Sequence, residues 1–155
     1  MNTTPQSIAA YLLTLPQVTS ATPCTVTIKG TTYPAARYTE HLTISPGCRA
    51  YAEGKREYDR EAFYVAGPLP ACKRNGNVAF RVTGESDDWY VSGYFPHVNG
   101  RTQDDIGNPK YDSFLPYHPF GASWYMSPWD IKDSKIDSYE RVPYKRVNVD
   151  VQAIA

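Results

Sequence analysis

Alternating apolar and polar residues are most regular over residues 78–95, which read VAFRVTGESDDWYVSGYF. In the first half, Val78, Phe80 and Val82 occupy one side of an extended chain, because successive side chains of a strand point to opposite faces. The second half alternates in the same way, and the polar turn at residues 84–88 contains a glycine. β-Branched and aromatic residues on both sides of such a turn predict a β-hairpin, around which we expect the rest of the chain to be organised.

A second hairpin is predicted closer to the N-terminus. Residues 24–29 alternate, Gly30 supplies a turn, and residues 31–38 return as the partner strand. Pro34 lies inside the returning run and indicates an edge position or a break, because proline cannot donate a ladder hydrogen bond. Residues 41–44 continue the same strand in this prediction.

The first segment of the chain predicts a helix from about Pro5 to Leu15. Thr4 can cap the helix through its side chain, and Pro5 suits the first helical position, where a missing N–H costs nothing. Ile8, Leu12 and Leu15 recur at the spacing of one helical face. The segment therefore predicts one amphipathic helix.

Two further stretches complete the predicted sheet. Residues 63–67 form a short apolar run, and residues 142–151 alternate valine with polar residues, which predicts a strand that pairs with the N-terminal half. Residues 49–61 carry mixed charges and are interpreted either as a short exposed helix broken at Gly54 or as an ordered surface loop. The sum is a single α+β domain over residues 1–155, with a mainly antiparallel sheet of about six strands, one N-terminal helix and a long ordered aromatic loop.

Regular alternation disappears over residues 96–129, where turn signals are interspersed with large rings. A long structureless loop is uncommon in a compact domain, and disordered segments are poor in aromatic residues. We therefore expect an ordered, packed loop, followed by a short helix near residues 131–138. Two interpretations of its rings stay open, a binding surface or a second small core on the sheet.

A partner-binding surface is the preferred interpretation of this loop, because tyrosine and tryptophan dominate the energetics of binding interfaces. The rings would be the anchors, and one arginine and one aspartate would stand on the polar rim. The residues expected to form this surface are Tyr111, Tyr117, Trp124, Tyr125 and Trp129, with Arg101 and Asp104 at the rim.

Charge limits the classes of partner. The 155 residues include 16 basic and 16 acidic ones, and this balance disfavours generic nucleic-acid binding, which depends on neutralising phosphates. One basic run near the C-terminus is interleaved with tyrosines. Nucleic-acid binding by this run stays an alternative, and the other interpretation is that its charges are simply exposed to solvent. The run consists of Lys132, Lys135, Arg141, Lys145 and Arg146.

Candidate chemistry is sparse in this sequence. None of the histidines, His41, His97 and His118, has a second histidine or a cysteine at the spacing of a metal site, so no metal or cofactor is expected. His97 and His118 fall in the aromatic loop near several aspartates, which leaves an enzyme acting on a small molecule or nucleotide as an alternative. The sequence contains no nucleophile elbow and no phosphate-binding loop, so no catalytic residue is assigned.

The cysteines and the N-terminal segment indicate a compartment. Cys24, Cys48 and Cys72 form neither an even set nor a CxxC motif, which argues for free thiols in a reducing compartment. The N-terminal segment lacks the basic region of a signal peptide, and no apolar stretch has the length of a membrane span. We therefore expect a cytoplasmic protein.

The combined prediction is a non-catalytic protein-binding module without membrane or cofactor. Small chains lacking catalytic motifs are common among phage and mobile-element accessory proteins, and by this association we expect an inhibitor of a host system or a virion component. The location would then be the host cytoplasm or the virion. The expected partner is another protein, and self-association stays open.

Overall fold

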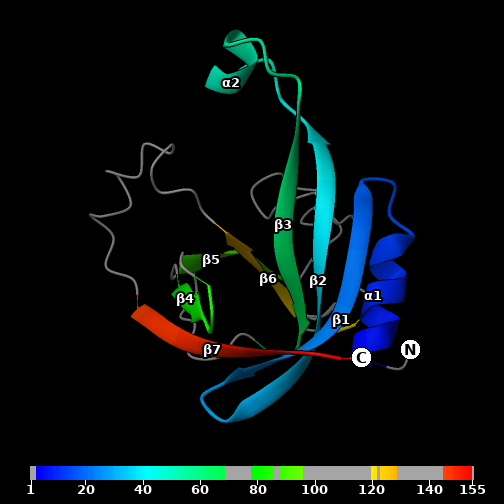
Figure 1. The fold of residues 1–155 in the computed structure, drawn as a ribbon, viewed down its shortest axis with the longest axis vertical. Helices are drawn as coiled ribbons and strands as arrows, with labels where there is room; N and C mark the ends of the chain where they lie inside the picture. The colour runs from blue at the N-terminus through cyan, green and yellow to red at the C-terminus, as the bar shows by residue number, and fades with distance from the viewer. Residues whose placement is uncertain are drawn as a thin grey trace.

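Seven strands, counted among the residues that the structure describes, curl into one closed barrel (Figure 1). The computed structural model describes residues 3–68, 78–85, 88–95, 120–121, 123–128 and 145–154. Neighbouring strands follow the order β1, β2, β3, β6, β5, β4, β7, and β7 pairs again with β1. The strands are β1 Val18–Ile28, β2 Thr31–Thr43, β3 Glu57–Ala66, β4 Val78–Val82, β5 Asp88–Phe95, β6 Ser123–Pro128 and β7 Lys145–Ala153.

Closure of this barrel requires one parallel contact. A ring in which every neighbour is antiparallel must contain an even number of strands, whereas the ring formed by the described residues has seven. The exception falls between β4 and β7, which run parallel with Phe80 opposite Val147. The other pairs are antiparallel, including the predicted hairpin of β4 and β5 with Phe80 opposite Trp89. The prediction of an α+β chain with a mainly antiparallel sheet is confirmed.

Helix α1, Pro5–Leu13, begins where the sequence predicts and ends two residues earlier. The Thr4 hydroxyl accepts a hydrogen bond from the Ser7 amide at 3.1 Å, and the Ser7 hydroxyl accepts one from the Thr4 amide at 2.9 Å. This capping box satisfies two donors at the start of the helix. Ile8 and Leu12 are fully buried, so α1 docks this face on the outside of the sheet.

Two apolar clusters hold the fold together, one inside the barrel and one under α1. Inside, Trp124 stacks on Phe80 with ring centroids 5.3 Å apart, and Phe63 meets Trp89 at 4.8 Å. These rings, together with the aliphatic side chains of the facing strands, fill the interior. The second cluster packs α1 against the outer face of β1, β2, β3 and β6, and includes Ile8, Leu12, Val18, Tyr38, Tyr64, Phe120 and Tyr125.

The β1–β2 hairpin turns through two residues with positive φ, Lys29 at 51° and Gly30 at 82°. Two such residues between paired strands form the turn whose twist matches the strands it joins. Pro34 pairs with Thr25 of β1, whereas the β2–β3 pairing begins at Ala35. The proline therefore lies where β2 has no described neighbour on its second side, as expected for a residue that cannot donate a ladder bond.

The prediction for the charged segment is correct over its first part only. Residues 49–61 were expected to be an exposed helix or a loop, and α2, Arg49–Ala52, is a short helix followed by a glycine turn at Gly54. From Glu57 onward, however, the chain is strand β3, paired with β2 from Thr43 inward. The prediction was wrong there because the partners of these charges lie across the sheet on β2, far from them in the sequence.

Other predictions fall partly outside the described residues. The C-terminal strand exists as β7 and pairs with β1 in the N-terminal half, as predicted. Most of the aromatic loop and the helix expected near residues 131–138 lie outside the part of the chain that is described. Neither α1 nor α2, the helices in the described part, has the length and apolar character that a membrane crossing requires.

Candidate functional site

Strands β2 and β3 continue together beyond the end of the barrel and carry α2 at their far end (Figure 1). We call residues 39–43 of β2 and 57–61 of β3 the arm. The register places Thr39 opposite Glu61, and the pairing continues out to the last residues of both strands. The pairing of β3 with β6 starts only at Phe63, so along the arm β3 pairs with β2 alone among the described strands. Strand β2 itself still pairs with β1 as far as Glu40.

The two faces of the arm differ in exposure. Opposite residues of paired strands share a face, so His41, Asp59 and Glu57 lie on the face that continues the barrel interior, here called the inner face. Their side chains are exposed by 46%, 68% and 64%, respectively. On the other face Glu40 is fully buried and contacts Arg60 at 3.0 Å. The outer face is therefore buried at Glu40 and Leu42 and exposed at Tyr58, which is 40% exposed, whereas the inner face is exposed at His41, Asp59 and Glu57.

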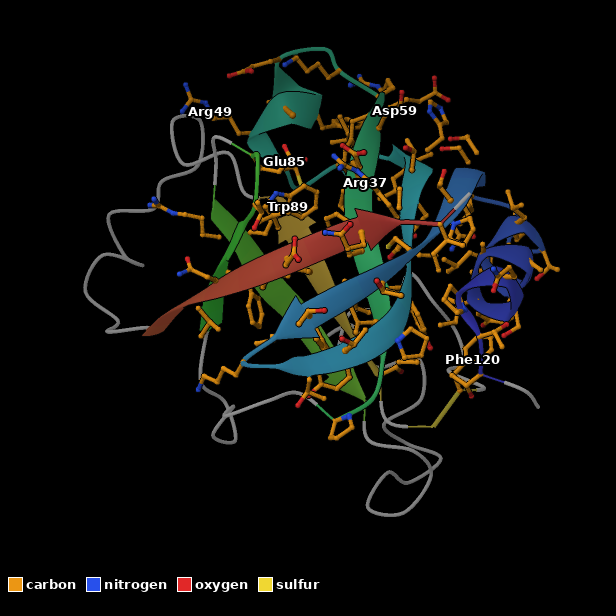
Figure 2. The ribbon with its side chains drawn as sticks, turned by 60° about the horizontal axis from the view of Figure 1, so that its bottom comes forward. Arg37, Arg49, Asp59, Glu85, Trp89 and Phe120 are labelled. Atoms are coloured by element: carbon orange, nitrogen blue, oxygen red, sulfur yellow. The ribbon has the colours of Figure 1, made fainter. Side chains whose placement is uncertain are left out.

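The base of the arm is fixed by Arg37, which points inward from β2 at the mouth of the barrel. Its Nη1 donates to Glu85 Oε1 at 2.9 Å, and its Nε donates to Glu61 Oε1. The guanidinium carbon also lies 5.1 Å from the ring centre of Phe63 and 5.5 Å from that of Trp89. Figure 2 shows Arg37, Glu85 and Trp89 close together, with Asp59 further along β3.

This Arg37 cluster connects elements that are far apart around the barrel. Arg37 stands on β2 and Glu85 follows β4, two strands that are not neighbours in the sheet. Hydrogen bonds to Glu61 first, and then to Glu85, raise the pKa of Arg37 above its ordinary value, so it stays charged at any physiological pH. Side chains of Arg37, Glu61 and Glu85 are 35%, 43% and 34% exposed, so solvent screens each pair and the cluster acts mainly by fixing the geometry.

The tip of the arm is also held by an arginine. Arg56 lies with its guanidinium carbon 3.6 Å from the ring centre of Tyr51 on α2. Its Nη1 donates to the carbonyl oxygens of Tyr51 at 2.8 Å and Lys55 at 3.1 Å. The Ile44 amide donates to the Arg56 carbonyl at 2.8 Å, which closes the turn that contains α2. The arm is therefore tied at both ends.

His41 is the titratable group at the centre of the inner face. Its Nδ1 lies 2.8 Å from Asp59 Oδ1, directly across the strand pair, and its Nε2 lies 3.4 Å from Glu57 Oε1. The hydrogen bond to Asp59, followed by that to Glu57, raises the pKa of His41 above 6.5. Histidine is the side chain that proteins commonly use as a proton switch, and here both neighbours favour its charged form.

The thiol of Cys24 lies inside the barrel, and we expect it to be unreactive. Only 3% of Cys24 is exposed, and burial raises its pKa to about 11, although Arg37 opposes part of that shift. The thiolate is the reactive form of cysteine. With Cys48 and Cys72 changed to serine, a thiol reagent at about pH 8 should label Cys24 only after denaturant is added. Rapid labelling of the native chain would contradict this placement.

The structure corrects the expected surface role of two aromatic residues. Trp124 and Tyr125 were predicted as partner-binding anchors, but both are fully buried. Trp124 points into the barrel, and Tyr125 lies in the cluster under α1. They are neighbours on a strand, so they point to opposite faces, and both faces of the sheet are covered at this position. For this pair the second interpretation, rings packed as core, is the correct one.

The remaining predicted site residues fall mostly outside the part of the chain that the structure describes. Tyr111, Tyr117, Trp129, Arg101 and Asp104 lie outside the described residues, as do the histidines of the enzyme alternative, His97 and His118. Of the basic run, Lys132, Lys135 and Arg141 also lie outside, and the backbone of Lys145 and Arg146 begins β7. Within the described ranges no three His, Cys, Asp or Glu side chains are grouped as a metal site requires.

Sequence reasoning missed the Arg37 cluster, although part of it left a signal. Arg37 follows Tyr33 and Ala35 at every second residue, and Glu61 precedes Phe63 with the same spacing. Charges in register with an inward apolar run indicate the mouth of a barrel. No such signal exists for Glu85, because its contact with Arg37 joins residues 48 positions apart.

Comparison of the chain with known proteins finds no match among protein-family models, curated proteins or solved structures.

Proposed function

We propose that this chain is a non-catalytic protein-binding module and that the inner face of the arm is its binding surface. One observation carries the proposal. The two strands extend past the β3–β6 pairing, and the face that continues the barrel interior presents three charged or titratable side chains, His41, Asp59 and Glu57, at 46–68% exposure. A strand pair that served only to complete the barrel would end where the barrel ends.

The fixed geometry of the arm supports binding. Arg37 holds its base to Glu61 and Glu85, and Arg56 holds the turn at its tip. A surface that is ordered before it meets a partner loses less conformational entropy on binding. The arm therefore suits recognition of another protein by its backbone shape and by side chains that project from one face.

The proposal replaces the aromatic anchors expected from the sequence. Trp124 and Tyr125 are part of the core, so they cannot contribute rings to a surface. A role for the other loop residues stays a prediction from the sequence, as does the association with phage or mobile-element inhibitors and virion components. Self-association through the arm is one form that the proposed binding can take.

Charge replacement on the arm tests the proposal. Thr43 and Glu57 are opposite each other and exposed, so Thr43→Arg with Glu57→Arg changes the inner face without removing core packing. We expect this double variant to lose at least about tenfold in affinity for the protein that the wild-type chain captures from its native host, since like-charge or steric contacts at an interface cost several kcal/mol.

The matched control is Asp150→Arg, an exposed carboxylate on β7 away from the arm. It should retain the captured protein, and circular dichroism should show that both variants fold. Equal capture by the arm variant and the wild-type chain would contradict the proposed surface.

A further inference from the structure

His41 places both of its ring nitrogens against carboxylates of the opposite strand. Nδ1 lies 2.8 Å from Asp59 Oδ1, and Nε2 lies 3.4 Å from Glu57 Oε1. A neutral imidazole carries a proton on one nitrogen only, so its second nitrogen would turn a lone pair toward a carboxylate oxygen. Only the imidazolium can donate in both directions, and the arrangement therefore favours the protonated ring.

From this geometry we propose that the arm is a proton-controlled element, in which the His41 imidazolium clamps β2 to β3 and release of its proton frees Asp59 and Glu57. The released state has an inner face more negative by one charge and a weaker connection between the two strands. The inference rests on the proposed function for its use, because the controlled surface is the binding surface, but the proton control can be measured on the chain alone.

Within the described part of the chain, the charged groups nearest to His41 come from β3. From β3, Asp59 and Glu57 face its ring, and Glu61 lies further in beside Arg37. On the side of the α1–β1 connection, the His41 amide donates to the Gln17 carbonyl at 2.7 Å, a bond that no proton on the ring alters.

The remaining nearby charges point elsewhere. Glu40 and Arg60 pair on the outer face, and the Arg56 guanidinium lies over Tyr51 at the tip. Among the described residues, Asp59 and Glu57 are therefore the charges that face the His41 ring.

The direction of the effect follows from the raised pKa of His41. Asp59 first, and then Glu57, favour its charged form in the folded chain. A group whose pKa is raised by folding stabilises the fold below its unfolded pKa, and that contribution is lost as pH rises through the folded value. The arm is therefore held most firmly in mild acid and loosens as the pH rises from slightly below neutral.

Hydrogen exchange at one amide of the arm measures the effect of the clamp, and exchange at one amide of the barrel serves as the control. The Ile44 amide donates to Arg56 at the end of the arm, and the Thr83 amide donates to Val149 in the barrel. By hydrogen exchange, the protection factor of Ile44 should fall roughly twofold to fivefold between about pH 5 and about pH 8.5, as expected for the loss of exposed ion pairs. The protection factor of Thr83 should stay constant over the same range.

Two variants, one single and one double, decide the outcome. His41→Gln removes the ring resonance that identifies His41 in the NMR titration, and it should abolish the pH step at Ile44. Asp59→Asn with Glu57→Gln should bring the titration of His41 down to about its ordinary midpoint. A wild-type midpoint at or below 6.5, or an Ile44 step that survives in His41→Gln, overturns the proposal.

Neither result depends on a partner. If the titration behaves as expected but the arm variant of the binding test keeps its captured protein, the proposed function fails and the proton control stands.

Discussion

The Trp124→Ala variant should lose about 3–5 kcal/mol of unfolding free energy, as large-to-small changes of buried aromatic residues do. Trp124 is fully buried in the barrel, stacked on Phe80 and 6.5 Å in an edge contact from Tyr33. Alanine would leave a cavity among side chains that come from all sides of the barrel and cannot collapse onto it. For a domain of this size, such a loss is a large fraction of the total stability.

Chemical denaturation followed by fluorescence and circular dichroism measures this loss. Leu13→Ala is the matched control, because Leu13 is an apolar side chain that is 54% exposed on α1. The control should change the unfolding free energy by no more than about 0.5 kcal/mol. If Trp124→Ala were as mild as Leu13→Ala, the ring would not be a core element and the corrected interpretation of β6 would be wrong.

Gly67→Ala should be the second severe change, with a loss of roughly 2–5 kcal/mol from backbone strain and overpacking together. Gly67 follows β3 with φ at +136°, a conformation that side chains other than glycine rarely adopt. A Cβ there would lie 2.5 Å from Cδ1 and 2.9 Å from Cε1 of the Tyr33 ring. That ring is buried against the barrel core, so the clash has to move core atoms or the backbone.

Thermal and denaturant unfolding of matched variants separates the two causes. Gly47→Ala is the control, since nothing lies within 4 Å of a Cβ at that position, and it should be nearly neutral. In a Tyr33→Leu background the cost of Gly67→Ala should shrink, because the clashing atoms are gone and the backbone strain remains. An unchanged cost in that background would remove the clash from the explanation.

Local patterns predicted the parts of this fold whose partners are close in sequence. Phe80 and Trp89 sit opposite each other because the alternation on both sides of a short turn sets the register of a hairpin. The helix start at Thr4 follows from capping chemistry within four residues. These features need no knowledge of the rest of the chain.

The remaining features depend on contacts between distant residues. Residues 57–61 look like a solvated run, and they become strand because β2 lies beside them. Trp124 and Tyr125 look like exposed loop aromatics, and they are buried because β6 lies between β3 and β5, with α1 packed on the outer face. A segment that is dense in aromatic residues and turn signals lacks the alternation of apolar and polar residues that predicts a strand. The contact between Glu85 and Arg37 was unpredictable for the same reason, because it forms only when the barrel closes.

A hydrogen-exchange footprint of the chain with its captured protein shows whether the inner face of the arm is the binding surface. If it is, residues 39–43 and 57–61 gain protection in the complex, and β7 around Asp150 is unchanged. Protection that appears elsewhere while the arm exchanges as it does in the isolated chain would contradict it.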